Sequence, residues 1–268
     1  CYVILNNTCV PTNSNGEFFV SYCNLTTFNI VAYDFSQNFF GAPITISNSI
    51  GMVDVGALQL CPNNVDTNSN PVTIIGTIAD IDGNVYQTVN INGKTWMAEN
   101  LETSKFNNGM NITQFISVDS ADTFIAWSYY NAWSYYNLDS SYGNFLGKLY
   151  NISVAQVTDH NVCPIGWHIS TSADWLHLIQ STGGFSSAGG ALKSTLAWQS
   201  PNVGATNAVD FNSIASGYAQ SDLYFNGFGT RATYWTPTEM VVIKNNSAAV
   251  EILTSNFAHA ASIRCVKD

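Results

Sequence analysis

A polar segment divides this chain and limits how it can fold. The stretch from Pro62 to Pro71 is bounded by prolines and carries no apolar periodicity. Such a composition is typical of a linker, because it offers no face that a core could bury. The total length of 268 residues suits one or two domains. We therefore expect a linker over residues 62–73, with separate domains at 1–61 and 74–268.

The segment before the linker has an all-β pattern. Runs of β-forming residues alternate with turn residues such as Asn15-Gly16, which predicts about four or five strands. A complete immunoglobulin-like sandwich has roughly seven. Residues 1–61 therefore predict a small, sandwich-like β-domain that is incomplete, and an open sheet edge there would be a template for a strand from a neighbouring chain.

The segment after the linker begins with two hairpin signals. Asp82-Gly83 and Asn92-Gly93 each stand between alternating apolar residues, as in two-residue β-turns. A β-meander is expected here. By contrast, Gly227-Phe228-Gly229 has no strand-to-helix context for binding phosphate. We interpret it as a glycine-rich loop.

One amphipathic helix is predicted after residue 171. Ser170 or Thr171 can cap its start, and Gly183 marks its end. Its apolar face would consist of Trp175, Leu178 and Ile179. A second short helix is predicted around residues 190–195, and strand-like segments return toward the C-terminus. The second domain is therefore expected to be α+β.

Charge excludes one class of partner. The formal net charge is −10, and the eight basic residues form no cluster, whereas a nucleic-acid footprint needs a basic patch. No apolar run is long enough to span a bilayer, and no cationic start marks a retained signal peptide. Cys1 is either the lipid-bearing cysteine of a processed lipoprotein or an ordinary residue, and both options stay open.

The six cysteines include no C-x-x-C pair and no histidine at metal-ligand spacing, which favours disulfides over a zinc site. Four cysteines precede residue 62 and two follow it, so each part can pair internally. We expect a Cys163–Cys265 disulfide. Three pairings remain open for the other four residues, Cys1, Cys9, Cys23 and Cys61.

Residues 126–137 are a tandem hexapeptide repeat rich in aromatic side chains. Aromatic faces stack on sugars, and tryptophan and tyrosine anchor protein interfaces. Alternatively, half of the rings belong to the core. We expect at least one of the two repeat tryptophans to be exposed and the repeat to contact a ligand. Its aromatic residues are Trp127, Tyr129, Tyr130, Trp133, Tyr135 and Tyr136.

Catalytic and metal signatures are absent from the sequence. No histidine stands in a hydrolase or metalloprotease motif, and His168 is interpreted as a structural residue packed on Trp167. Residues 80–84 do not fit a calcium loop and are expected to form a hairpin turn. An alternative calcium site would use Glu239 with Asp210 or Asp222, by analogy with lectins. No cofactor and no metal is otherwise expected.

Six ordered blocks of sequence cover residues 80–101, 142–151, 163–179, 189–218, 234–239 and 262–268. In this order they resemble the Fibrobacter succinogenes major paralogous domain. This resemblance implies a C-type-lectin-like fold with long loops and a disulfide near the C-terminus, in surface and secreted proteins of Bacteroidota and Fibrobacteres. Ile169-Ser170 and residues 236–239 depart from the pattern without affecting the fold. Residues 9–61 are more distantly similar to carboxypeptidase-regulatory-like or immunoglobulin-like β-sandwich repeats.

These observations favour a non-catalytic binding or adhesion module on the bacterial cell surface. Its partner would be a glycan or a surface protein, contacted through the aromatic loops. The alternative is a structural subunit of a surface filament, in which neighbours donate strands to the N-terminal sheet edge and form homo-oligomers. A polysaccharide-active enzyme would need paired carboxylates, for which no signature is present.

Overall fold

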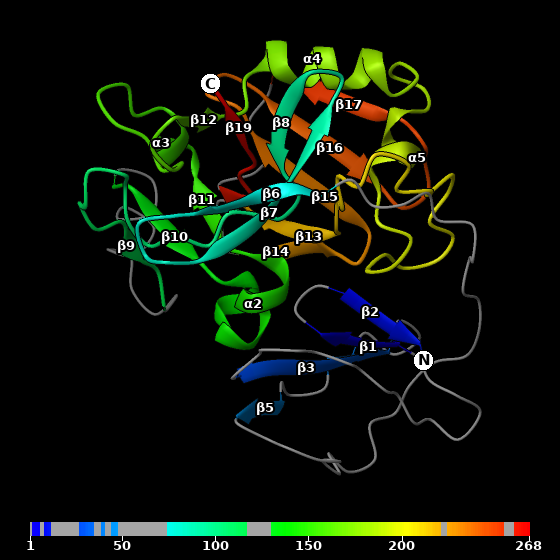
Figure 1. The fold of residues 1–268 in the computed structure, drawn as a ribbon, viewed down its shortest axis with the longest axis horizontal. Coiled ribbons are helices and arrows are strands. Elements are labelled where there is room, and N and C mark those ends of the chain that lie inside the picture. Colours follow the sequence, from blue (N-terminus) through cyan, green and yellow to red (C-terminus); the bar gives the residue numbers. More distant parts are fainter. Residues whose placement is uncertain are drawn as a thin grey trace. The chain divides into compact units, whose positions relative to one another are not determined.

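The computed structural model of the chain (Figure 1) separates two compact units, Cys1–Pro71 and Val72–Asp268. The boundary between them lies in the segment that the sequence marks as a linker. The structure describes residues 2–5, 8–11, 27–34, 39–40, 44–47, 74–116, 130–220, 224–254 and 260–268.

The first unit contains an antiparallel sheet with the strand order β2-β1-β3-β4, in which β5 also pairs with β3. Further runs of β-forming residues at 18–23 and 53–60, and the disulfide partners of Cys1, Cys9, Cys23 and Cys61, lie outside what the structure describes. The strands are β1 (Tyr2–Leu5), β2 (Thr8–Pro11), β3 (Thr27–Asp34), β4 (Phe39–Phe40) and β5 (Ile44–Ser47).

A five-stranded sheet with the order β12-β19-β8-β7-β6 opens the second unit. Both predicted hairpins are confirmed. The β6–β7 turn contains Gly83 at φ 88°, and the β7–β8 turn has Asn92 at φ 49° and Gly93 at φ 88°, as a type I′ turn requires. The strands are β6 (Ile74–Ala79), β7 (Val85–Ile91), β8 (Lys94–Met97), β12 (Trp167–Ile169) and β19 (Cys265–Lys267).

The second sheet of this unit is larger and mixed. Its order is β17-β16-β15-β13-β18-β11-β10-β9, with β14 paired to β13, and the pairs β9–β10 and β13–β15 are parallel. Its strands are β9 (Thr113–Gln114), β10 (Ala132–Ser134), β11 (Leu149–Asn151), β13 (Ser216–Ala219), β14 (Phe225–Phe228), β15 (Arg231–Trp235), β16 (Met240–Lys244), β17 (Val250–Leu253) and β18 (Ala260–Ala261).

The glycine-rich loop prediction needs a correction. Gly227 and Phe228 end strand β14, and only Gly229 and Thr230 form the turn into β15, closed by the Thr230 N–H donating to Gly227 O at 2.9 Å. Glycine is required inside this strand because Gly227 has φ 76°, and a Cβ there would lie 2.9 Å from that of Arg231.

The predicted amphipathic helix is confirmed as α4 (Ser172–Ser181). Thr171 caps it in a reciprocal capping box with Asp174. Gly183, whose φ is 106°, follows the C-cap residue Thr182, as expected for a glycine that stops a helix. The shorter helices are α2 (Gly143–Leu146), α3 (Ile152–Ala155) and α5 (Ala188–Leu192), and single 3₁₀ turns are η1 (Tyr136–Leu138) and η2 (Ser140–Tyr142).

Helix α5 begins two residues before the predicted start at Gly190. Glycines usually weaken a helix, so the sequence did not favour an earlier start. Here Gly189 and Gly190 are required by packing, because a Cβ would lie 2.5 Å from Ala249 O and 2.3 Å from Gly204 O, respectively.

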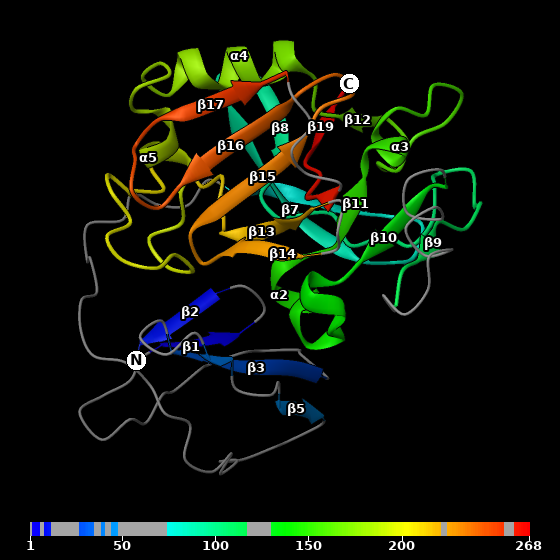
Figure 2. The ribbon, with the colours of Figure 1, turned by 180° about the vertical axis from the view of Figure 1, so that it is seen from behind.

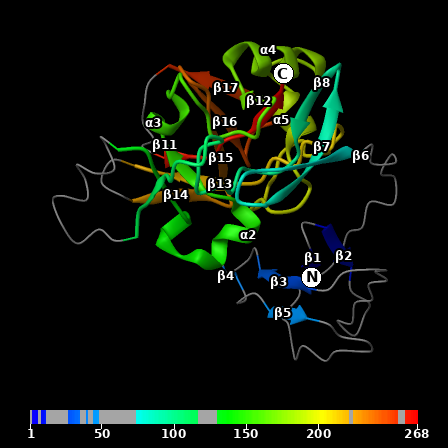
Figure 3. The ribbon, with the colours of Figure 1, turned by 60° about the vertical axis from the view of Figure 1, so that its left-hand side comes forward.

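Helix α4 packs against both sheets. Leu178 of α4 shares a buried apolar cluster with Ile91 and Trp96 from the β7–β8 hairpin and with Val241 from β16. Figure 3 shows α4 next to β8 and β17, and Figures 1 and 2 place it on the same side of this unit. Four tryptophans are buried at 5% exposure or less in the sheets and in α4, namely Trp96, Trp167, Trp175 and Trp235.

The α+β expectation holds only in part, because the regular secondary structure of the described residues is mainly β-strand, in mixed sheets, with short helices apart from α4. Helical signals in the sequence were local, whereas many strands of the larger sheet have only two to four residues and carry little periodicity. The predicted Cys163–Cys265 disulfide is confirmed, with a Cα–Cα distance of 5.9 Å.

Candidate functional site

The aromatic repeat is only partly available to a ligand. Trp127 and Tyr129 lie outside the described residues. Tyr130 is 64% exposed, but Trp133 of β10 is buried. The Trp133 indole N–H donates to Ile112 O at 3.1 Å, and the Lys148 ammonium lies 4.0 Å from the centre of its ring. Trp133 therefore belongs to the core and cannot stack on a ligand.

The two tyrosines that follow Trp133 also pack within the fold. Tyr135 meets Trp133 edge to face at 5.1 Å, and Tyr136 contacts Phe225 and Phe228 at 5.3 and 5.4 Å. The aromatic rings of residues 133–136 therefore serve mainly to stabilise the fold. Of the two repeat tryptophans, Trp133 is buried and Trp127 lies outside the described residues.

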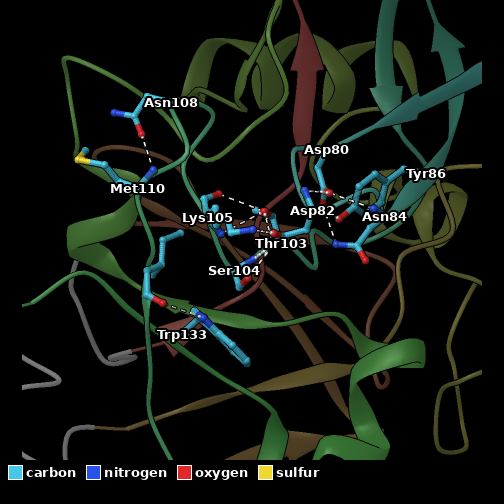
Figure 4. A network of polar contacts seen from close by, with 11 residues as sticks. Asp80, Asp82, Asn84, Tyr86, Thr103, Ser104, Lys105, Asn108, Met110 and Trp133 are labelled. Carbon is cyan, nitrogen blue, oxygen red and sulfur yellow. Dashed lines mark hydrogen bonds and ion pairs between the residues drawn. The ribbon is translucent and has the colours of Figure 1, made fainter.

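The turn between β6 and β7 is built around Asp80 (Figure 4). One carboxylate oxygen of Asp80 accepts the backbone N–H groups of Asp82 and Asn84 at 2.9 and 3.0 Å. The other accepts the Asn84 amide at 2.8 Å and the Tyr86 hydroxyl at 2.5 Å. Four donors surround the carboxylate, so it stabilises the turn, as the sequence predicted.

Asp82 connects residues 103–105 to this turn (Figure 4). Its carboxylate accepts from the Ser104 N–H and hydroxyl, both at 2.6 Å, from Thr103 Oγ1 at 3.1 Å, and pairs with Lys105 at 2.8 Å. Burial alone would raise the pKa of Asp82, but these donors hold it well below its usual range. Asp82 is therefore a structural anion.

The calcium site considered from the sequence gains no support in the described ranges, where no three His, Cys, Asp or Glu side chains gather as metal ligands. Glu239 instead accepts a short hydrogen bond from the Ser172 hydroxyl at the start of α4. Asp222, one of its suggested partners, lies outside those ranges.

A groove of about 640 Å³ lies on the surface of the second unit. It runs between the loop at 105–110, the segment at 155–171 and Pro237. Strands β9 and β10 and helix α3 lie at this same end of the unit in Figures 1 and 2. The groove is lined by Asn107, Asn108, Ala155, Val157, Thr158, Asp159, His160, Asn161, Ile165, His168, Ile169, Thr171 and Pro237.

The two walls of the groove are held together by backbone and ring contacts. The Asn107 N–H donates to Asn161 O at 2.8 Å. Phe106 packs edge to face on His160, with 4.6 Å between the ring centres. His160 also pairs with Asp159 through Nδ1 at 2.8 Å. These contacts preform the groove, which lowers the ordering cost of binding.

His168 stands at one end of the groove, between two carboxylates. Its Nε2 lies 3.0 Å from Asp174 and its Nδ1 lies 2.6 Å from Asp268. Successive side chains of β12 point to opposite faces, so His168 is only half-buried between the buried Trp167 and Ile169, and the two carboxylates rather than the expected packing on Trp167 fix its ring. With both ring nitrogens engaged, His168 offers no free site for base catalysis.

Asp174 is the buried centre of this arrangement. Burial would raise its pKa, but hydrogen bonds from Lys94, Thr171 and His168 lower it below the usual range. The carboxylate thereby connects the β7–β8 hairpin, the start of α4 and β12.

A family model described as Fibrobacter succinogenes major domain matches residues 89–267, more than half of the chain. The chain belongs to this family. No curated protein and no solved structure matches it. Within the ranges that the structure describes, no helix has the length and apolar character to cross a membrane.

The family match begins inside β7, yet the turn at Asp80 is part of the same unit of structure. Two ionisable residues of the Fibrobacter succinogenes major domain, Glu102 and Lys148, were not predicted from the sequence to be functional. Glu102 follows the buried Leu101, and Lys148 is a single cation among apolar residues. A charged residue in an apolar segment is the sequence signal that could have identified them.

The pKa values of Glu102 and Lys148 are both shifted by burial and by neighbouring charges. Burial raises the pKa of Glu102 to about 7; Lys148 opposes this rise, and the carboxylates of Glu99 and Asp80 add to it. Burial also lowers the pKa of Lys148, against the attraction of Asp82, Glu102 and Asp80. Such groups are candidates for function as well as for pH-dependent stability.

We predict that Glu102→Gln stabilises the protein at alkaline but not at acidic pH. The native pKa of about 7 exceeds the ordinary 4.5, so the folded wild type binds more protons between these values and loses stability as pH rises through them. The variant lacks this loss. Relative to wild type it should gain about 1–3 kcal/mol between pH 4.5 and 8 in urea unfolding.

Glu251→Gln is the matched control, because Glu251 makes a surface pair with Lys244 at 2.7 Å and should change stability by less than about 1 kcal/mol. A Glu102→Gln difference that stays constant with pH would contradict the raised pKa.

Proposed function

We propose that this chain is a non-catalytic, extracellular binding module of a bacterial cell surface. The observation that carries the proposal is the preformed groove, whose lining comes from separate loops on a frame closed by the Cys163–Cys265 disulfide. Binding sites are commonly built on loops that a rigid scaffold positions. Tyr130, exposed next to β10, is a second candidate contact for a ligand.

A binding role is favoured over catalysis by how the polar groups are used. Asp80, Asp82 and Asp174 are each occupied by several donors, and His168 by two carboxylates. A polysaccharide-cleaving enzyme needs one free acid and one free base across the bond. Glu102 is the described carboxyl group that best fits the acid, and its neighbour Asp80 is committed to the turn.

The lectin-like interpretation is part of this proposal. Two features support it. The C-terminal strand β19 pairs with β12 and is joined by the disulfide to the loop before β12, and long irregular segments connect the strands. The alternative, a subunit of a surface filament, is kept because β2 ends the strand order of the described N-terminal sheet, and sheet edges accept donated strands. A concentration-dependent mass in solution would favour that alternative.

The test of binding uses the full chain against a panel of purified polysaccharides and immobilised proteins. We predict saturable binding to at least one member and no release of reducing sugar. Tyr130→Ala should weaken that binding about tenfold, as expected for an exposed aromatic anchor. Tyr224→Ala, which removes a similarly exposed ring (69%) near β14, is the matched control. Hydrolysis of a panel member would contradict the proposal.

A further inference from the structure

We propose that the groove holds an extended peptide of a partner protein, with an aliphatic side chain against Ile165 and a basic side chain at Asp159. The inference rests on the binding role proposed above and names the class of ligand for this groove. It is carried by three properties of the lining: its apolar residues, its side-chain amides and its charge.

The apolar part of the groove is aliphatic. Ala155, Val157, Ile165, Ile169 and Pro237 line it, and no Trp, Tyr or Phe does so. Sugars are usually recognised against flat aromatic faces, whereas branched aliphatic surfaces pack well against aliphatic side chains. The groove therefore suits a peptide side chain better than a pyranose ring.

Ile165 is presented as a rigid anchor. It is 84% exposed and stands at the tip of a turn closed by the Trp167 N–H, which donates to Pro164 O at 2.9 Å. Gly166 adopts φ 80° in this turn, and the preceding Cys163 is fixed by the disulfide. An aliphatic side chain held in water by such a turn costs little further entropy on binding.

Side-chain amides in the opposite wall can pair with a peptide backbone. Asn107 and Asn108 use their oxygens within the fold, accepting from Asn161 N at 3.5 Å and Met110 N at 3.0 Å. No described group accepts from their Nδ2 atoms, which are therefore able to donate to peptide carbonyl groups. This is the complement that an extended backbone needs.

Charge selects the second side chain of the ligand. The Asp159 carboxylate is 81% exposed and is paired through one oxygen with His160. No Lys or Arg lines the groove, and the whole chain carries a net charge of −10. A lysine or arginine of the ligand would be attracted to this end, and an acidic peptide would be repelled.

The experiment is to pan a phage-displayed library of random heptapeptides on the immobilised full chain and to synthesise the most enriched sequences. We expect them to combine Lys or Arg with Val, Ile, Leu or Met. Their affinity should fall at least tenfold for Ile165→Asp and for Asp159→Lys. Both changes lie at exposed positions, so urea unfolding should match wild type. Ile81→Asp, at an exposed aliphatic residue in the β6–β7 turn, is the control and should bind normally.

Enriched sequences that lack basic residues, or whose affinity both groove variants leave intact, would overturn the inference. If no peptide is enriched while the polysaccharide and protein panel still shows saturable binding, this inference fails and the binding role stands. If the chain binds neither library nor panel, both fail together.

Discussion

Replacing Arg264 with methionine should lower the free energy of unfolding by about 3–5 kcal/mol. This arginine is fully buried between Ile263 and Cys265. Its guanidinium donates to Asn100 Oδ1 at 2.7 Å and to the carbonyl oxygens of Met97, Phe211 and Asn212 at 3.1, 2.7 and 2.9 Å. Methionine fills the space but leaves these acceptors without donors, and unsatisfied buried carbonyls are costly.

Arg264→Lys should recover only part of the loss. A lysine keeps the charge but has a single nitrogen, which cannot reach four acceptors that a planar fork serves. The matched control is Arg231→Met, since Arg231 is half-buried on β15 beside the Tyr218 ring. We expect that change to cost about 1 kcal/mol or less. Equal losses at both positions in urea unfolding would contradict the special role of Arg264.

Lys193 is held in the same way as Arg264. Its ammonium is buried and donates to the carbonyl oxygens of Val203, Lys244 and Ser247 at 2.8, 3.1 and 2.9 Å. Burial lowers its pKa to about 8. Arg264 and Lys193 are thus both basic residues that stabilise the interior. The reason is that irregular connections such as 193–215 leave carbonyl groups without sheet partners, and buried cations supply the missing donors.

The contacts of these buried cations are an example of structure that could not be predicted from the sequence. Hairpins at Asp82-Gly83 and Asn92-Gly93, the capped helix at Thr171 and the disulfide were predictable because each depends on a few neighbouring residues or on cysteine count. Arg264 and Lys193 depend on carbonyls that are distant in sequence, such as Phe211 O for Arg264. The spacing of these residues in the sequence does not indicate those contacts.

The aromatic repeat shows the same limit for the candidate site. Six rings in two identical copies predicted a shared surface, but the fate of each ring depends on its strand position. Trp133 is buried because its ring packs in the core cluster with Phe106 and Ile112, whereas Tyr130, before β10, is exposed. The groove was not predicted, because Asn107 and Asn161 meet only through the tertiary fold.

Removing the disulfide should have an effect of similar size to the loss of Arg264. In the double variant Cys163→Ala with Cys265→Ala, we expect the free energy of unfolding to fall by about 4–5 kcal/mol. The two cysteines are 102 residues apart, so the bond restricts a long loop of the unfolded chain. That loop includes α4, α5 and strands β13 to β18.

The native contacts around the bond should persist without it. Both cysteines are fully buried, so alanine keeps the site apolar, and β19 retains its pairing with β12 and β8. The expected result is therefore a folded protein whose urea midpoint falls while its native circular dichroism is unchanged. Reduction of the wild type in urea should shift its midpoint to that of the double variant. A loss below about 1 kcal/mol would mean that the reduced, unfolded chain is already compact between residues 163 and 265, so the bond restricts little.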